Sequence, residues 1–269
     1  MEQDRSRARV TGSPEELLDI AVGAARRAGE LLLTYFDGPA AGVVAKTSPT
    51  DLVSDADRAA ERLLLDAILE NRPDDGVLAE EGGARDSTTG VTWVVDPLDG
   101  TVNFLFGIPV WSVSIAVQDE QGTVVGVVHD PSRDETFAAR RGAGATLNGR
   151  SIRVSESDAL ETALIGTGFS YESDARVRQG EVLQRVLPNV RDIRRAGSAA
   201  LDLAAAACGR LDGFYEGSME PWDKAAGALL VVEAGGIVSQ LDPPLGHLSA
   251  GVVAAGPGLH AQLRDLVVS

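Results

Sequence analysis

The chain has 269 residues, a formal net charge of −16 and one cysteine, Cys208. This negative charge disfavours nucleic acid, because nothing here would replace the phosphate counterions, and it equally disfavours docking on an anionic membrane, so we expect neither as a partner. A single cysteine cannot form an internal disulfide, and the N-terminus MEQDRSRARV lacks the apolar core of a signal peptide. We therefore expect a cytoplasmic protein that folds as one domain over 1–269.

The first half of the chain predicts two helices followed by a series of strands. Apolar residues recur at helical spacing from a cap-like Ser13 to Phe36, and again over 55–70, where Asn71-Arg72-Pro73 ends the pattern. Between them AKTSPTDLVSDAD, 45–57, predicts a polar loop that leads into the second helix. Strands are then predicted at 76–79, at 91–96 and, as an antiparallel meander, at 110–118, 123–130 and 135–141.

The second half of the chain predicts alternating strands and helices. It begins with a glycine-rich turn over 142–149, which contains a hairpin-like Asn148-Gly149. Strands are predicted at 163–169, 190–195, 212–216 and 251–256, and helices at 173–187, 198–208, 222–234 and 258–267. This alternation predicts stacked α and β layers, with a soft boundary between two lobes near 145–160.

The stretch WVVDPLDGTVNF, 93–104, carries the main candidate site. We expect the strand to end at Asp96, because Pro97 fixes φ and has no backbone N–H to donate. The resulting bend can bring the carboxylates of Asp96 and Asp99 to one side, with the Leu98 carbonyl between them. A plain polar turn is the competing interpretation of this motif.

The next two residues of the motif provide a place for an anion. Gly100 permits close approach of the backbone, and the N–H groups of Gly100 and Thr101 can open a helix whose N-terminus attracts a phosphate. Carboxylate and carbonyl ligands, with no Cys or His nearby in sequence, favour Mg²⁺ or Mn²⁺ over Zn²⁺. A divalent cation would also relieve the repulsion between two such close aspartates.

Acidic residues elsewhere in the chain strengthen the metal interpretation. Glu80 and Glu81 follow a short predicted strand, and strand ends converge in layered α/β folds. Asp223 stands at the start of the predicted helix in PWDKAAGALLVVEAGG. Taken singly, the glutamates can form a solvated turn and Asp223 can simply favour a helix N-terminus. Their joint occurrence favours a shared site.

With Lys46, Asp51, Asp57 and the run Gly197-Ser198-Ala199-Ala200, these motifs resemble the inositol monophosphatase family of metal-dependent sugar phosphatases. The motifs occur in order from about Lys46 to Gly236, which is most of the chain. The resemblance implies an α+β fold, a layered α-β-α-β-α sandwich. It also implies lithium sensitivity and a homodimer.

The resemblance assigns roles to particular residues. The implied ligands of two or three Mg²⁺ ions are Glu80, Glu81, Asp96, Asp99, Asp223 and the Leu98 carbonyl. Gly100 and Thr101 would bind the phosphate, and Asp57 would pair with Thr101. Contacts to the substrate's hydroxyls are implied for Asp99, Gly197, Ser198, Ala199, Glu216 and Asp223. Lys46 and Asp51 fall at the edge of the implied site.

The mechanism we expect is hydrolysis of a phosphate monoester by metal-activated water. Glu80, with the Asp57–Thr101 pair, would orient that water and accept its proton. Inositol-1-phosphate is the first-ranked substrate; fructose-1,6-bisphosphate, histidinol phosphate and adenosine 3′,5′-bisphosphate are alternatives. The last would need positive charge beside the site, for which Arg191, Arg194 and Arg195 are candidates.

Two departures from the family pattern bear on the substrate rather than on the chemistry. Ser198 replaces the commoner threonine, and Met219-Glu220 precedes Pro221 in a segment that varies with the leaving group. From a different class of function, the fold could serve as a catalytically silent interaction scaffold. The intact acidic set argues against that alternative.

Overall fold

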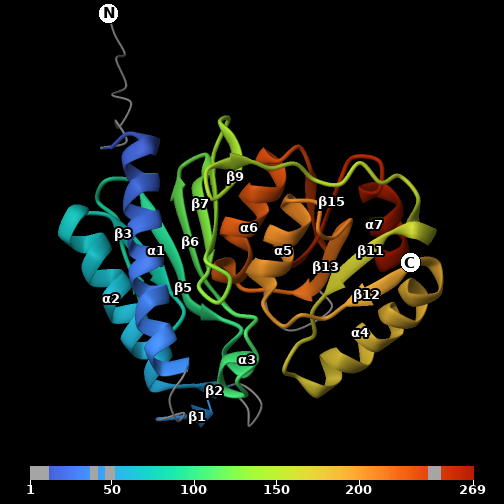
Figure 1. Cartoon of the computed structure of the whole chain (residues 1–269), viewed down its shortest axis with the longest axis horizontal. Helices are drawn as coiled ribbons and strands as arrows, with labels where there is room; N and C mark the ends of the chain where they lie inside the picture. Colours follow the sequence, from blue (N-terminus) through green and yellow to red (C-terminus); the bar gives the residue numbers. More distant parts are fainter. Residues whose placement is uncertain (1–11, 37–41, 46–51, 242–249) are drawn as a thin grey trace, which may run out of the picture.

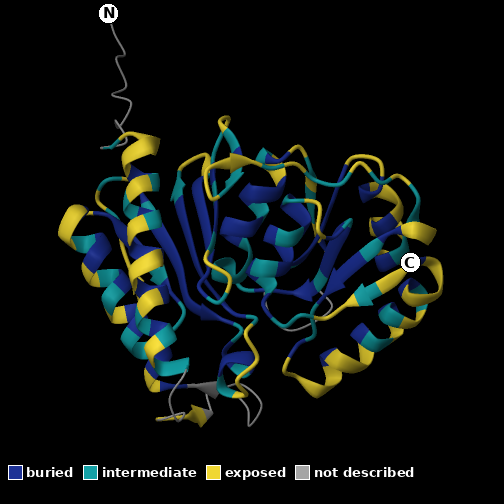
Figure 2. Cartoon of the chain, in the orientation of Figure 1, coloured by how far each residue is buried: buried dark blue, intermediate teal, exposed yellow. Residues whose placement is uncertain are grey.

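Five layers stack in the order helix, sheet, helix, sheet, helix in a computed structural model (Figure 1). The structure describes residues 12–36, 42–45, 52–241 and 250–269. The predicted α-β-α-β-α sandwich is therefore confirmed. Exposed residues lie on the outer faces of the outer helices, while the strands and the central helices are largely buried (Figure 2).

The first helical layer consists of α1 (Pro14–Phe36) and α2 (Asp55–Asn71). The buried stripe of α1 is mainly alanine and leucine at helical spacing, and small side chains let the helix approach the sheet closely. A Cβ on Gly29, for example, would lie 2.7 Å from the His129 side chain of the sheet. Both helices begin and end within a residue of the predicted positions, because caps and apolar periodicity are local signals.

The larger sheet has the strand order β10-β9-β8-β7-β6-β5-β3-β4. Only β3 and β5 pair in parallel within this sheet; its other neighbours are antiparallel, as the predicted meander requires. Its strands are β3 (Gly76–Ala79), β4 (Gly83–Arg85), β5 (Thr92–Asp99), β6 (Ser112–Asp119), β7 (Gly122–Asp130), β8 (Glu135–Arg140), β9 (Gly144–Leu147) and β10 (Arg150–Ser151).

Two predictions about this sheet need correction. The turn predicted over 142–149 was wrong over 144–147, where β9 forms and pairs with β8 despite Gly144. The Asn-Gly hairpin itself is confirmed: Asn148 and Gly149 have φ values of 49° and 76°, as a tight two-residue turn between β9 and β10 requires. The short edge strand β4 was not predicted at all.

The end of β5 is also different from the prediction. The strand does not stop at Asp96 but continues through Pro97 to Asp99, with a shift of its register against β6 between the two aspartates. A bulge of this kind accommodates a proline, since the missing N–H is not needed for pairing there. The predicted helix then follows as α3 (Thr101–Leu105), with Gly100 in the left-handed region at φ 98°.

The central layer and the second sheet come from the C-terminal half. α5 (Ala199–Ala207) and α6 (Pro221–Glu233) lie between the two sheets, and a Cβ on Gly227 would lie 2.5 Å from the Cβ of Leu203. The second sheet has the order β12-β11-β13-β15-β14, with α4 and α7 on its outer face. Its strands and outer helices are β11 (Leu164–Thr167), β12 (Asp192–Arg194), β13 (Gly213–Ser218), β14 (Ile237–Leu241), β15 (Ala250–Ala255), α4 (Ser173–Val186) and α7 (His260–Val268).

The remaining segments are short. Strands β1 (Val44–Ala45) and β2 (Leu52–Val53) pair within the segment predicted as a polar loop, and β14 was missed because its sequence is short and partly polar. The segment from β10 to β11 crosses from the first sheet to the second, near the expected lobe boundary; the expectation of a single domain stays a prediction. No described helix has the length and apolarity needed to span a membrane.

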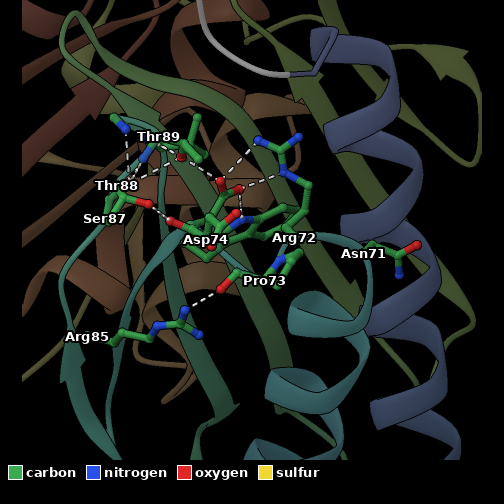
Figure 3. A network of polar contacts seen from close by, with 12 residues as sticks. Asn71, Arg72, Pro73, Asp74, Arg85, Ser87, Thr88 and Thr89 are labelled. Carbon is green, nitrogen blue, oxygen red and sulfur yellow. Dashed lines mark hydrogen bonds and ion pairs between the residues drawn. The ribbon is translucent and has the colours of Figure 1, made fainter.

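A buried carboxylate fixes the start of β3 to its surroundings. Asp75 is 1% exposed; it accepts two hydrogen bonds from the Arg72 guanidinium, at 2.8 and 3.0 Å, and one each from Thr89 Oγ1 (2.6 Å) and Trp93 Nε1 (2.9 Å). Figure 3 shows Arg72 and Thr89 among the polar contacts of this network. Burial alone would raise the pKa of Asp75, but these hydrogen bonds lower it below the ordinary value of an aspartate. The ionised Asp75 therefore stabilises the fold at neutral pH, and this contribution is lost as pH falls through the lowered pKa.

Asp75→Ala is expected to lower the free energy of unfolding by about 3 to 5 kcal/mol, because it removes the buried carboxylate that pairs with the Arg72 guanidinium and accepts the hydrogen bonds of this network. Urea denaturation measures the change. The matched control is the neighbouring, exposed Asp74, whose replacement by Ala should change stability by less than about 0.5 kcal/mol. Equal effects of the two substitutions would show that the network contributes little.

Candidate active site

One pocket gathers most of the predicted site residues from segments far apart in sequence. It lies where the end of β5 meets the first turns of α5 and α6, and Glu216 of β13 also lines it. The predicted residues that line it are Glu80, Asp96, Leu98, Asp99, Gly100, Thr101, Gly197, Ser198, Ala199, Glu216 and Asp223.

Asp57 stands just behind the pocket, in contact with Thr101. Its Oδ1 accepts a hydrogen bond from the Thr101 hydroxyl at 2.9 Å, while its Oδ2 accepts the Ser54 N–H at 2.8 Å as part of the capping box of α2. Thr101 Oγ1 also lies 3.0 Å from the Leu98 carbonyl oxygen. The helix cap therefore holds Asp57 where it can orient the Thr101 hydroxyl, and both side chains are buried.

Asp96 is the most strongly perturbed carboxylate of β5. It is 2% exposed, and its Oδ1 accepts the Leu98 N–H at 2.9 Å. Burial raises the pKa of Asp96 well above its ordinary value, and the nearby carboxylates of Glu80, Asp99 and Asp223 raise it further. Asp96 is also within hydrogen-bonding reach of Glu80. Such a group is costly unless a proton or a cation compensates its charge.

Asp99 connects β5 to the N-terminus of α5. Its carboxylate accepts hydrogen bonds from the Ser198 hydroxyl, the Ala200 N–H (2.8 Å) and the Ala199 N–H (3.2 Å). Burial raises the pKa of Asp99, and these hydrogen bonds oppose the increase. Because only the hydroxyl of Ser198 is used, its departure from the family's threonine preserves this contact.

Asp223 enters the pocket from the first turn of α6. Pro221 begins the helix, and Asp223 Oδ2 accepts the Glu220 N–H at 2.7 Å in a capping box. Burial raises the pKa of Asp223 well above its ordinary value, with further contributions from Glu80 and Asp99. An N-terminal helix charge was the plainer interpretation of this residue; the structure places it beside the other carboxylates as well.

The donor set of the pocket fits a hard divalent cation. Among the described residues, no group of three or more His, Cys, Asp or Glu side chains is positioned, as it stands, to hold a metal ion. Six carboxylates nevertheless line one cavity, and repulsion among them contributes to the raised pKa values of Asp96 and Asp223. An all-oxygen set that needs compensating positive charge suits Mg²⁺ or Mn²⁺.

Among the described residues, two of the predicted site residues, Asp57 and Glu81, are not part of the pocket lining. Glu81 lies beside it, and its N–H donates to Glu61 Oε2 at 2.8 Å. Lys46 and Asp51 lie outside the described residues, so their expected place at the site edge stays a prediction.

Two charged residues that line the pocket, Asp202 and Arg195, were not among the site residues predicted from the sequence. Asp202 is the only charged residue of α5, and a lone carboxylate in an alanine-rich helix was a signal that could have been used. Arg195 was named only as one of three candidate arginines. The structure places it at the pocket, whereas Arg194 pairs with Asp192, and Arg191 donates to the Thr162 carbonyl.

This layered fold, with clustered carboxylates beside a short helix N-terminus, defines a metal-dependent phosphomonoesterase. The family model described as the inositol monophosphatase family matches residues 13–268. The chain belongs to this family, so the resemblance noted in the sequence is confirmed.

Named relatives agree with this assignment. The chain is 48% identical over 236 residues to an inositol-1-monophosphatase of Mycobacterium bovis, covering 84% of this chain and 81% of that protein. It is 42% identical over 256 residues to the Nus factor SuhB of Escherichia coli K12, covering 93% and 96%. The solved extragenic suppressor protein suhB of Bartonella henselae superposes with a TM-score of 0.87 at 37% identity, covering 93% of this chain and 98% of that one. A Thermotoga maritima IMPase has a TM-score of 0.84 at 36% identity, covering 93% and 96%.

Proposed function

We propose that this phosphatase hydrolyses inositol-1-phosphate to myo-inositol and phosphate, with two or three Mg²⁺ ions per site and Mn²⁺ as a possible substitute. The observation that carries the proposal is the meeting of Glu80, Asp96, Asp99 and Asp223 in one pocket that also contains Glu216. The carboxylates would hold the cations, and Glu216 would accept hydrogen bonds from a polyol. The name of the mycobacterial relative supports the substrate.

The side chains divide into three tasks. Glu80, Asp96, Asp99, Asp223 and the Leu98 carbonyl would hold the cations, which when bound activate water and neutralise charge on the phosphate. Glu80 and the Asp57–Thr101 pair would orient the attacking water and accept its proton. The amides of Gly100 and Thr101 would stabilise the phosphoryl oxygens. Glu81 would contribute to a third, weaker cation site.

The alcohol half of the ester would lie on the side formed by α5 and β13. Ser198, Glu216 and the backbone at Gly197 and Ala199 line that side of the pocket. Arg195 also lies there, which keeps fructose-1,6-bisphosphate, histidinol phosphate and adenosine 3′,5′-bisphosphate as alternatives, since a guanidinium can bind a second phosphate. Inositol-1-phosphate remains first because the neighbouring carboxylate Glu216 suits hydroxyls better than a second anion.

A panel of phosphate esters tests the proposal. The purified protein is expected to release phosphate from inositol-1-phosphate in Mg²⁺, to lose this activity in EDTA, and to be inhibited by Li⁺. The alternative esters and 4-nitrophenyl phosphate complete the panel. Faster turnover of a bisphosphate than of inositol-1-phosphate would replace the proposed substrate, and no Mg²⁺-dependent release from any ester would contradict the catalytic assignment.

An interaction role is the second candidate function, because the Escherichia coli relative is named a Nus factor. Normal phosphatase activity in a variant that no longer binds a protein partner would separate this role from catalysis.

We further propose a cytoplasmic homodimer. The exposed side chains of Phe106 (74%) and Ile108 (46%), close together in the segment after α3, support a contact between protein surfaces. A solution mass of one chain at micromolar concentration would exclude the dimer.

A further inference from the structure

Asp202 is a buried carboxylate with no hydrogen-bond partner among the residues that the structure describes. It is 4% exposed and lines the active-site pocket from α5. Its backbone N–H donates to the Ser198 carbonyl at 3.0 Å within the helix, but its carboxylate makes no hydrogen bond to any residue that the structure describes. Burying such a group costs free energy, so it is a candidate for a functional role.

Gly168, which follows β11, makes room for Glu216, and Gly166 on β11 lies close to Asp202. A Cβ on Gly168 would lie 2.1 Å from Glu216 Oε2, so no side chain is possible there while Glu216 keeps its position. A Cβ on Gly166 would lie 3.7 Å from Asp202 Oδ1. Both carboxylates line the same pocket, and the charge of Glu216 contributes to the raised pKa of Asp202, so the two groups lie close together.

The charges around this pair leave both carboxylates poorly compensated. Burial raises the pKa of Asp202 to about 8, with contributions from Glu216 and Asp99, and burial raises the pKa of Glu216 to about 8, with a contribution from Asp99. Arg195 lowers both values, but it is one cation for two carboxylates. Hydroxyl donors from a ligand would satisfy oxygens that the protein leaves without donors.

We infer that Asp202 is a specificity-determining residue, which together with Glu216 accepts hydrogen bonds from adjacent hydroxyls on the alcohol half of the substrate. This inference rests on the proposed function. Inositol carries a hydroxyl on every ring carbon not bonded to phosphate, so two neighbouring acceptors can bind two neighbouring donors. A site built to bind hydroxyls discriminates against esters that lack them, because its buried acceptors are then left unsatisfied.

The test compares two esters in Asp202→Ala and Asp202→Asn. The measured quantity is the ratio of kcat/KM for inositol-1-phosphate to kcat/KM for 4-nitrophenyl phosphate, whose alcohol half has no hydroxyl. For Asp202→Ala this ratio is expected to fall about tenfold to a hundredfold, mainly through KM for inositol-1-phosphate. Asp202→Asn, which keeps one acceptor oxygen, should lose less. Asp265→Ala, an exposed position on α7, is the control and should keep the wild-type ratio.

Thermal unfolding separates this role from a structural one. Both Asp202 variants remove a buried carboxylate that accepts no hydrogen bond from the described residues. Their melting temperatures should therefore equal or exceed that of the wild type. Equal losses on both esters with a lowered melting temperature would overturn the inference, and so would an unchanged ratio. If the wild type hydrolyses 4-nitrophenyl phosphate but no polyol phosphate, the proposed substrate fails and the role of Asp202 fails with it. If the wild type prefers inositol-1-phosphate and the variants keep that preference, only the role of Asp202 is wrong.

Discussion

Asp96→Asn is expected to reduce Mg²⁺-dependent phosphate release at least about a hundredfold, because the proposed function makes the Asp96 carboxylate a ligand of the cations. Its loss removes a charged ligand from a pocket in which it is 2% exposed and close to three other carboxylates. Charge stabilisation by a bound cation contributes several kcal/mol to such reactions, and about 2.7 kcal/mol corresponds to a hundredfold change in rate.

The substitution is nearly isosteric, so its effect can be separated from unfolding. Burial and the neighbouring carboxylates raise the pKa of Asp96, and a neutral Asn relieves that repulsion. The variant should therefore be at least as stable as the wild type in EDTA. Asp119→Asn is the control on the same sheet: Asp119 pairs with Arg141 at the end of β6, away from the pocket, and its replacement should leave turnover within about twofold. Near-normal turnover by folded Asp96→Asn would refute the assignment.

Saturating Mg²⁺ is expected to stabilise the folded protein by about 2.7 kcal/mol when the free ion exceeds its Kd a hundredfold, provided that the unfolded chain binds none. The physical reason is the cluster of carboxylates, whose repulsion a cation converts into attraction. Thermal unfolding in EDTA and in millimolar Mg²⁺ measures the difference. The stabilisation by Mg²⁺ should be much smaller in Asp96→Asn, which serves as the matched control.

The same stabilisation should depend on pH in a defined direction. In the metal-free protein the pKa values of Asp96, Asp99 and Asp223 are raised, and those of Asp202 and Glu216 reach about 8. The folded state therefore binds more protons than the unfolded state. The contribution of Asp202 and Glu216 to stability is full below about pH 4 and is lost as pH rises through about 8, and that of the other three carboxylates changes in the same direction. Since cations compete with these protons, the Mg²⁺ increment should grow from pH 5 to pH 8. An increment that shrinks over this range would contradict the account.

Much of the fold follows from local features of the sequence. The capping residues Ser13 and Ser54 and the apolar stripes of α1 and α2 act within a few residues, so both helices could be predicted closely. The strand β5 could not, because its continuation past Pro97 depends on a bulge against β6. The same is true of β9, because the glycines in and around it favour a turn, whereas its strand conformation depends on pairing with β8.

The candidate site was predictable only in part, for a related reason. Asp96, Asp99 and Asp223 could be named because each stands in a motif, and the resemblance to a family indicated that they meet. Their raised pKa values arise from burial and from charges on other elements, which no local pattern contains. Asp202 was missed because its place depends on β11 and β13 as well as on its own helix.

Anomalous scattering from Mn²⁺ in a crystal of the protein tests the central claim most directly. We expect strong peaks inside the pocket, bonded to oxygen atoms of Asp96, Asp99, Asp223 and Glu80, and no such peaks in crystals of Asp96→Asn. Mn²⁺ bound only elsewhere on the chain, with these four carboxylates turned away from one another and from any ion, would contradict it.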